Sequence, residues 1–185
     1  MEPSKTIVLD RDGVINQDSA DYIKSHKEWS PLPGSVDAIA SLHNAGYKVI
    51  VATNQSGLGR GYFDEYALAN IHHKLCSMVE DGGGLVSGIF FCPHLPDDNC
   101  ECRKPNTGML VQAEQEFGLS LTGCVFVGDS RKDLQAALAF DMRPVLVRTG
   151  NGAKTEQEIG DTEFAQVPVY DDLFSAVQEL LTKEN

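Results

Sequence analysis

The segment Ile7-Val8-Leu9-Asp10-Arg11-Asp12-Gly13 places two carboxylates, two residues apart, at the end of a short apolar run. Ligands of open α/β sheets bind at the carboxyl ends of the strands, so a strand ending here would present Asp10 and Asp12 at a ligand-binding edge. Such a pair can hold a divalent cation and keep an oxygen free for chemistry. Taken alone, the segment is better explained as a solvated turn in which Gly13 supplies a positive φ.

Three later segments favour the first interpretation. The β-branched run Val49–Asn54 carries the hydroxyl of Thr53 at its end, and the apolar run Cys124–Asp129 ends in a carboxylate, with Asp133 following. Arg103-Lys104-Pro105 places two cations where a helix would begin, because proline is tolerated in the first turn of a helix. Acidic, hydroxyl and cationic residues thus fall repeatedly at strand ends or helix starts, which indicates a single site.

Apolar periodicity predicts an alternation of strands and helices along the chain. We expect strands near 5–10, 47–53, 86–91, 123–128 and 143–148, and helices near 34–45, 63–80, 106–118, 131–140 and 171–182. This alternation predicts an α/β fold, a Rossmann-like doubly wound parallel sheet with helices on both faces. The mixed tract 150–168 is expected to wrap the surface, and residues 1–185 are expected to form a single domain.

Composition limits the classes of partner. The chain has 185 residues, 42% of them hydrophobic, which is enough for one core, and its net charge of −12 argues against nucleic acid or an anionic membrane as a partner. We find no signal peptide and no apolar stretch as long as a membrane span, so we expect a cytoplasmic protein. The same charge repels a phosphorylated substrate at long range, so the site must supply cations locally. The basic residues near the motifs are Arg11, Arg60, Arg103, Lys104, Arg131 and Lys132.

Cysteine spacing gives a second signal. Cys92-x-His94 and Cys100-x-Cys102 offer four soft ligands in one loop, as in a closed tetrahedral Zn²⁺ site. Four protein ligands leave no position for water, so we expect a structural zinc that fixes the loop presenting Arg103. A disulfide is the alternative, although a reducing cytosol disfavours it.

In this order the motifs resemble those of the haloacid dehalogenase superfamily of phosphotransferases. Its four motifs match Asp10-Arg11-Asp12-Gly13, Thr53, Lys104, and Gly128-Asp129 with Asp133. The phrases Thr53-Asn54-Gln55-Ser56-Gly57, Cys92-Pro93-His94 and Cys100-x-Cys102-Arg103-Lys104-Pro105 are closest to the branch of D-glycero-D-manno-heptose 1,7-bisphosphate phosphatases, relatives of histidinol-phosphate phosphatase. The resemblance covers about residues 5–150 and implies the same zinc loop.

The resemblance, together with the needs of phosphate transfer, assigns roles to these residues. Asp10 would be the nucleophile that forms an aspartyl phosphate, and Asp12 the general acid and base. Mg²⁺ would bind Asp10, Asp129 and, by the family pattern, the backbone carbonyl of Asp12. Thr53 and Lys104 would hold the transferring oxygens. A site of oxygen ligands suits Mg²⁺, whereas the sulfur-rich loop suits Zn²⁺, so the two metals should not compete.

The substrate side of the site is expected to be open. Many superfamily members carry a cap domain, but the gaps after Asp12 and Thr53 are too short for a large one. Residues 14–30 would form a flap, from which Asp18, Ser19 and Tyr22 could reach a polyhydroxylated substrate. Further positions that match substrate contacts of the family are Asn54, Gln55, Ser56 and Arg103. Ser130 stands where relatives can carry a substrate-contacting lysine; Arg131 or Lys132 could supply that charge, or the contact could be missing.

The expected activity is therefore removal of the 7-phosphate of the heptose bisphosphate, a small phosphorylated sugar, by a monomeric enzyme. The resemblance places this step in ADP-heptose and lipopolysaccharide core biosynthesis. Histidinol-phosphate phosphatase remains an alternative, since it shares the motifs and the zinc loop. Two alternatives from other classes are a phosphorylated receiver domain, against which Asp12 and the late position of Asp129 argue, and a zinc-stabilised binding module.

Overall fold

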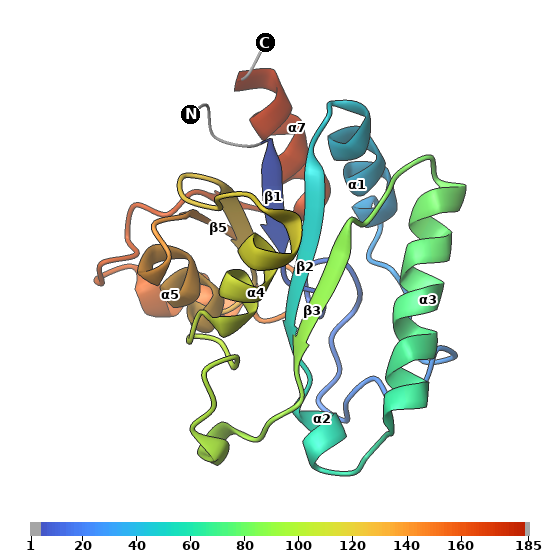
Figure 1. The fold of residues 1–185 in the computed structure, drawn as a ribbon. Helices are drawn as coiled ribbons and strands as arrows, with labels where there is room; N and C mark the ends of the chain where they lie inside the picture. Colours follow the sequence, from blue (N-terminus) through green and yellow to red (C-terminus); the bar gives the residue numbers. More distant parts are fainter. Residues whose placement is uncertain (1–4, 184–185) are drawn as a thin grey trace.

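A parallel six-stranded sheet runs through the computed structural model, which describes residues 5–183 (Figure 1). Its strands lie in the order β3-β2-β1-β4-β5-β6, and every neighbouring pair is parallel. They are β1 (Thr6–Leu9), β2 (Lys48–Asn54), β3 (Gly88–Cys92), β4 (Val125–Gly128), β5 (Arg143–Val147) and β6 (Val169–Tyr170). This is the order of Rossmann-type sheets, and it differs from the 2-1-3-4-5 order of receiver domains. The predicted doubly wound α/β fold is confirmed.

Helices cover both faces of the sheet, which explains why its central strands carry consecutive apolar residues and not an alternation of apolar and polar ones. In β1, Ile7 and Leu9 face one core and Val8 faces the other. The first core lies under α1 (Ser35–Asn44), α3 (Glu65–Asp81) and α7 (Leu173–Lys183), whereas the second lies under α4 (Gly108–Phe117) and α5 (Arg131–Ala139) (Figure 1). Within residues 5–183, none of the helices is long and apolar enough to cross a bilayer.

The predicted elements all form, with every boundary within two residues of the expected one. The structure adds three helical segments, α2 (Ser56–Gly59), η1 (Pro96–Asp98) and α6 (Gly152–Ile159), as well as the short strand β6. The expectation for residues 150–168 was therefore wrong in part. This tract forms a helix, and its Ile159 and Phe164 bury a small core against Leu134 and Leu146.

The topology brings two motif-bearing strand ends together. The chain passes from β1 outward to β2 and β3 and then returns to place β4 on the other side of β1. Leu9 pairs with Val127, and the Asp10 amide donates to the Val127 carbonyl at 3.0 Å. The residues that follow β1 and β4 therefore lie at the switch point of the sheet, where open α/β sheets bind ligands.

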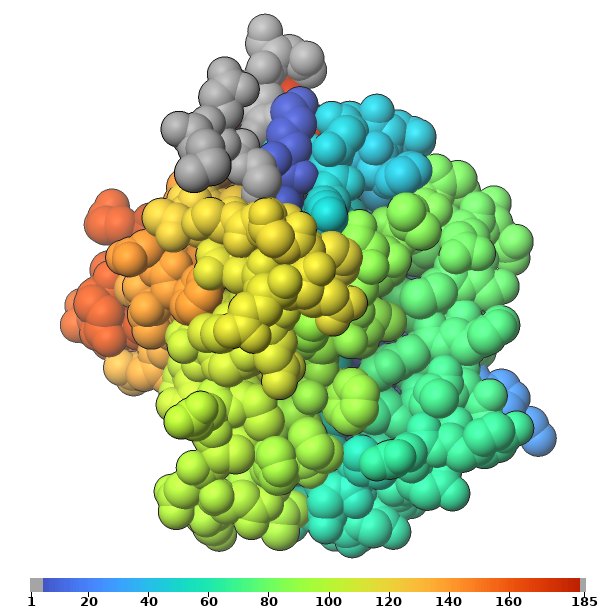
Figure 2. Space-filling view, in the orientation of Figure 1, coloured from blue at the N-terminus to red at the C-terminus, as the bar shows by residue number. Residues whose placement is uncertain are grey.

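Two loops extend past this edge of the sheet. The segment after β3 forms the lower left edge of the molecule, beside the segment of α2 (Figure 2). The amide of Gly59 donates to the carbonyl of Pro93 at 3.1 Å, which joins the two segments. The predicted flap, residues 14–30, is fixed to the core by Trp29, whose side chain is 1% exposed.

Candidate active site

Three carboxylates gather at the switch point between β1 and β4. Asp10 follows β1, Asp129 follows β4, and Asp133 lies in the first turn of α5. All three are buried, and one oxygen from each lies within 4.8 Å of the others. Burial and the neighbouring carboxylates raise the pKa of Asp10 well above its usual value, and burial together with Asp133 raises the pKa of Asp129 to about 7. A cation among these oxygens would offset the repulsion, so the cluster could hold a metal ion.

Lys104 places a positive charge against two of these carboxylates. Its Nζ lies 2.8 Å from Asp10 Oδ1 and 2.7 Å from Asp133 Oδ1, and it donates to the Ala52 carbonyl at 2.8 Å. Burial alone would lower the pKa of Lys104, but the charges of Asp10 and Asp133 raise it, so the ammonium stays charged. Asp133 thus helps to hold the Lys104 ammonium beside Asp10.

Two glycines leave room for the Asp129 carboxylate. Gly13 and Gly150 have φ values of +81° and +59°, and a Cβ on either would overlap Asp129 Oδ2. Asn151 fixes that oxygen with its backbone amide at 2.8 Å and its Nδ2 at 3.2 Å. The result is a narrow space walled by backbone and lined by carboxylate oxygens, which are the ligands that Mg²⁺ prefers. The residues present therefore fit a magnesium ion.

The Asp12 carboxylate accepts hydrogen bonds on both oxygens. Oδ1 accepts from Arg11 Nη2 at 2.9 Å and from Asn16 Nδ2 at 2.9 Å, and Oδ2 accepts from Gln55 Nε2 at 2.7 Å. The same Gln55 nitrogen donates to Thr53 Oγ1 at 2.9 Å. Burial alone would raise the pKa of Asp12, but the Arg11 charge and these hydrogen bonds lower it below its usual value. A carboxylate fixed in this way can accept or return a proton at a defined position.

A cavity of about 530 Å³ opens over these groups. It brings together the four predicted catalytic residues Asp10, Asp12, Thr53 and Lys104, together with Asp129. Of the predicted substrate residues, those lining it are Asp18, Ser19, Tyr22, Asn54, Gln55 and Arg103. Ser56 is instead buried at the start of α2 and is not among the lining residues that the structure describes. The role of each in binding substrate stays a prediction.

Besides Gln55, the Asn54 and Asp18 side chains also have protein partners. The Asn54 amide bridges the backbone of Lys104, accepting from its N–H at 3.0 Å and donating to its carbonyl at 3.2 Å. Asp18 accepts from Asn151 Nδ2 at 3.1 Å. Asn54 thus fixes the Lys104 backbone against the end of β2, and Asp18 connects the flap to the loop before α6.

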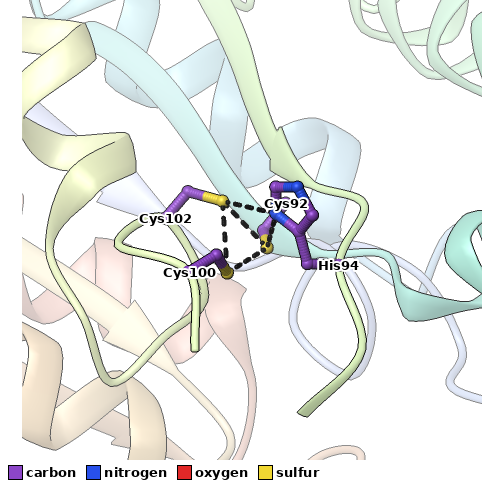
Figure 3. Close-up of side chains that lie close together, drawn as sticks. All are labelled: Cys92, His94, Cys100 and Cys102. Carbon is purple, nitrogen blue, oxygen red and sulfur yellow. Dashed lines mark hydrogen bonds between the residues drawn. The ribbon is translucent and has the colours of Figure 1, made fainter. Parts of the chain in front are cut away.

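The second cluster lies in the loop after β3 (Figure 3). Its members are the predicted zinc ligands Cys92, His94, Cys100 and Cys102, and one ligand atom of each lies within 4.8 Å of the others. Cys92 Sγ is 3.0 Å from Cys102 Sγ and 3.6 Å from Cys100 Sγ, and His94 Nδ1 is 3.2 Å from Cys102 Sγ. Tetrahedral zinc with bonds of about 2.3 Å to sulfur needs ligand atoms roughly 3.7 Å apart. The cluster fits such an ion, and the described cysteines form no disulfide.

The sequence did not reveal the partners of three residues. Arg11, one of the basic residues near the motifs, is fully buried and its guanidinium is paired with Asp12. His72 Nε2 lies 3.2 Å from Arg11 Nη1, a contact between two segments far apart in the sequence. Asn151 comes from the tract expected to wrap the surface. The only sequence feature that could indicate a role for Asn151 is its position in a Gly150-Asn151-Gly152 turn, which is a weak signal.

Comparison with known proteins identifies close relatives. A family model described as HAD-hydrolase-like matches residues 101–176. The D-glycero-beta-D-manno-heptose-1,7-bisphosphate 7-phosphatase of Pseudomonas aeruginosa is 50% identical over 175 residues, 95% of this chain and 97% of that protein. The Pseudomonas putida protein of the same name is 49% identical over 178 residues, 96% of this chain and 99% of that one. The crystal structure of the D,D-heptose 1,7-bisphosphate phosphatase from B. bronchiseptica, complexed with magnesium and phosphate, matches with a TM-score of 0.91 at 48% identity, covering 96% of this chain and 98% of that chain.

Proposed function

The chain belongs to the D-glycero-D-manno-heptose 1,7-bisphosphate 7-phosphatase family of the haloacid dehalogenase superfamily, and we propose that it removes the 7-phosphate of this heptose bisphosphate. The observation that carries the proposal is the pairing of a buried, Lys104-bound Asp10 with a fixed second carboxylate, Asp12, in one cavity. The product would feed ADP-heptose and lipopolysaccharide core biosynthesis.

The reaction divides into two steps. Asp10 attacks the phosphorus, the bond from phosphorus to the sugar oxygen breaks, and Asp12 donates a proton to that oxygen. Asp12 takes up this proton when substrate is bound, because the negative charge of the phosphate raises the pKa that Arg11 otherwise lowers. Asp12 then takes a proton from water, the water oxygen bonds to phosphorus, and the bond from phosphorus to Asp10 breaks. Lys104 and Thr53 hold the phosphoryl oxygens, and each such donor contributes about 3 kcal/mol in the transition state.

Mg²⁺ would be held by the carboxylates of Asp10 and Asp129 and by the backbone carbonyl of Asp12. When bound, it would supply positive charge that offsets the repulsion between a carboxylate and a phosphate dianion. Zn²⁺ would be held by the four-residue cluster after β3, where it would stabilise the loop. That loop carries Arg103, whose Nη1 donates to the His94 carbonyl at 3.3 Å.

The second phosphate of the substrate would lie against Arg103 and Lys132. Both line a hollow of about 200 Å³ next to the main cavity, and no acidic residue is among the described residues that line it. The Lys132 side chain makes no hydrogen bond or ion pair with residues 5–183, whereas Arg131 Nη2 lies 3.7 Å from Glu163 Oε1. Lys132 is therefore the better candidate for the charge that Ser130 lacks. The sugar would contact Asp18, Ser19 and Tyr22.

Other features of the proposal concern the protein as a whole. We propose that residues 1–185 act as one domain, as a monomer in the cytoplasm. Neither nucleic acid nor membrane is proposed as a partner, since the net charge of −12 opposes binding to phosphate-rich polymers.

Side-by-side kinetics test the substrate. We expect a higher kcat/KM for the heptose 1,7-bisphosphate than for heptose 7-phosphate or histidinol phosphate. A hydrogen bond to a charged group contributes about 1.5–3 kcal/mol, so Arg103→Ala should lower kcat/KM for the bisphosphate roughly 10- to 100-fold and that for the monophosphate much less. Arg143→Ala, at the opposite edge of the sheet, is the matched control. A preference for histidinol phosphate would reject the heptose substrate and leave the phosphatase chemistry intact.

A further inference from the structure

The Arg11 side chain is unusual because arginine side chains are mostly exposed, whereas this one is buried. It is fully buried, and its guanidinium makes two contacts at opposite ends. Nε and Nη2 donate to Asp12 Oδ1 at 3.1 and 2.9 Å, and Nη2 also reaches Oδ2 at 3.1 Å. The planar fork of an arginine fixes a carboxylate in orientation as well as in position, which an ammonium cannot do.

His72 holds the other end of that guanidinium. It comes from α3, far from the motifs in sequence, and its Nε2 lies 3.2 Å from Arg11 Nη1. Burial, with the Arg11 charge, lowers the pKa of His72 to about 3, so the ring is neutral and its Nε2 accepts the hydrogen bond. The Phe91 ring lies 5.9 Å from the imidazole ring, between centroids, and helps to fix its plane.

We propose that His72 and Arg11 form a positioning pair for Asp12, so that a helix outside the cavity sets the orientation of the proton-transferring carboxylate. His72 is not among the described residues that line the cavity, and neither is Arg11. Both therefore act through Asp12 and not on the substrate. The inference rests on the proposed function, because it gives Asp12 the role of acid and base.

This arrangement predicts an effect on kcat and not on KM. General acid–base catalysis is worth roughly 10²- to 10⁴-fold, and small misplacements of a catalytic group can remove about 10²-fold. We expect His72→Leu, which lacks an acceptor, to lower kcat about 10-fold with KM within about twofold. His72→Gln offers an amide oxygen to Arg11 and should recover kcat to within about threefold of the wild type. These magnitudes correspond to partial loss of acid–base catalysis.

His73→Leu is the matched control, since His73 lies next in sequence on the same helix but is exposed. Arg11→Lys retains the charge but cannot reach Asp12 and His72 together, so its kcat should fall at least as far as that of His72→Leu. Steady-state kinetics on the heptose bisphosphate and thermal unfolding would be measured for all variants in the presence of Mg²⁺.

The outcomes distinguish a failure of the proposed function from a failure of the positioning pair. No phosphate release by the wild type would reject the proposed function itself. If the wild type is active, three outcomes would overturn the positioning pair. The first is an equal kcat for His72→Leu and His72→Gln, and the second is a change confined to KM or to the unfolding temperature. The third is a wild-type kcat for Arg11→Lys. If His72→Leu does not fold, Arg11→Lys and His72→Gln still decide the question.

Discussion

Replacing Gly150 by alanine tests whether the backbone wall beside Asp129 shapes the metal site. A Cβ at this position would overlap Asp129 Oδ2 and would lie 2.5 Å from Gly13 Cα. The carboxylate cannot turn away without loss, because Asn151 donates two hydrogen bonds to the same oxygen. Either the loop that carries Gly150 or the Asp129 side chain must move.

Gly118 provides a control with the same backbone geometry. Both glycines have φ of +59°, but a Cβ at Gly118 would meet no atom within 4 Å. Gly118→Ala should therefore cost only the left-handed conformation, about 1–2 kcal/mol of unfolding free energy. Gly150→Ala adds overpacking of about 1–3 kcal/mol, which gives a total of roughly 2–5 kcal/mol. Because the substitution displaces a metal ligand, Mg²⁺ affinity should also fall about 10- to 100-fold.

Two measurements check this expectation. Urea unfolding in the presence of a chelator gives the free energy of the metal-free fold, and titration calorimetry with Mg²⁺ gives the affinity. The proposed role of the Gly150 backbone is wrong if Gly150→Ala and Gly118→Ala lose the same stability and both bind Mg²⁺ with the affinity of the wild type. A loss of stability without any loss of affinity would place the metal away from Asp129.

The remaining predictions concern the nucleophile, the proton-transferring carboxylate and the two metals. Asp10→Asn should abolish turnover and leave no phosphoenzyme, and near-wild-type turnover of this variant would contradict the assignment. Asp12→Asn should form phosphoenzyme but slow its breakdown about 10²- to 10⁴-fold. Acid quenching with radiolabelled substrate measures the phosphoenzyme in both variants. Purified protein should contain about one zinc per chain and still need added Mg²⁺ for activity, by metal analysis and assay. Cys102→Ser should lose zinc and unfold at a lower temperature. The control Cys76→Ser, which lies outside the cluster, should keep its zinc. A zinc-free, fully stable wild type would show that the loop does not bind this metal.

The core of the fold could be predicted because its strands are buried on both faces. The runs that become β1, β2 and β4 each hold three or four consecutive apolar residues, a pattern typical of parallel sheets buried on both faces. Two of the missed elements are short: α2 has four residues and β6 has two, so in neither can a hydrophobic period repeat. In α6 only Thr155 and Ile159 mark the buried face besides a glycine, which is too few for a helical pattern.

One part of the site could be predicted because the sheet dictates its geometry. Asp10, Thr53 and Asp129 lie at carboxyl ends of parallel strands, and such ends meet at one edge whatever the loops do. Lys104 was found through its motif. The inward direction of the Arg11 side chain could not be predicted, because a loop lacks the regular alternation of inward and outward side chains that a strand has. Its contact with His72 joins two segments that no local pattern connects.

The charge of the cavity explains how an acidic protein can select a phosphate ester. Six acidic and five basic side chains are among the described residues that line it, so the site is nearly balanced although the whole chain carries −12. Lys104 is already paired with Asp10 and Asp133, which leaves little free positive charge at the nucleophile. A divalent cation beside Asp129 would reverse the sign of the local charge. Phosphate should therefore bind weakly until the metal is present, and metal binding should come first in the reaction.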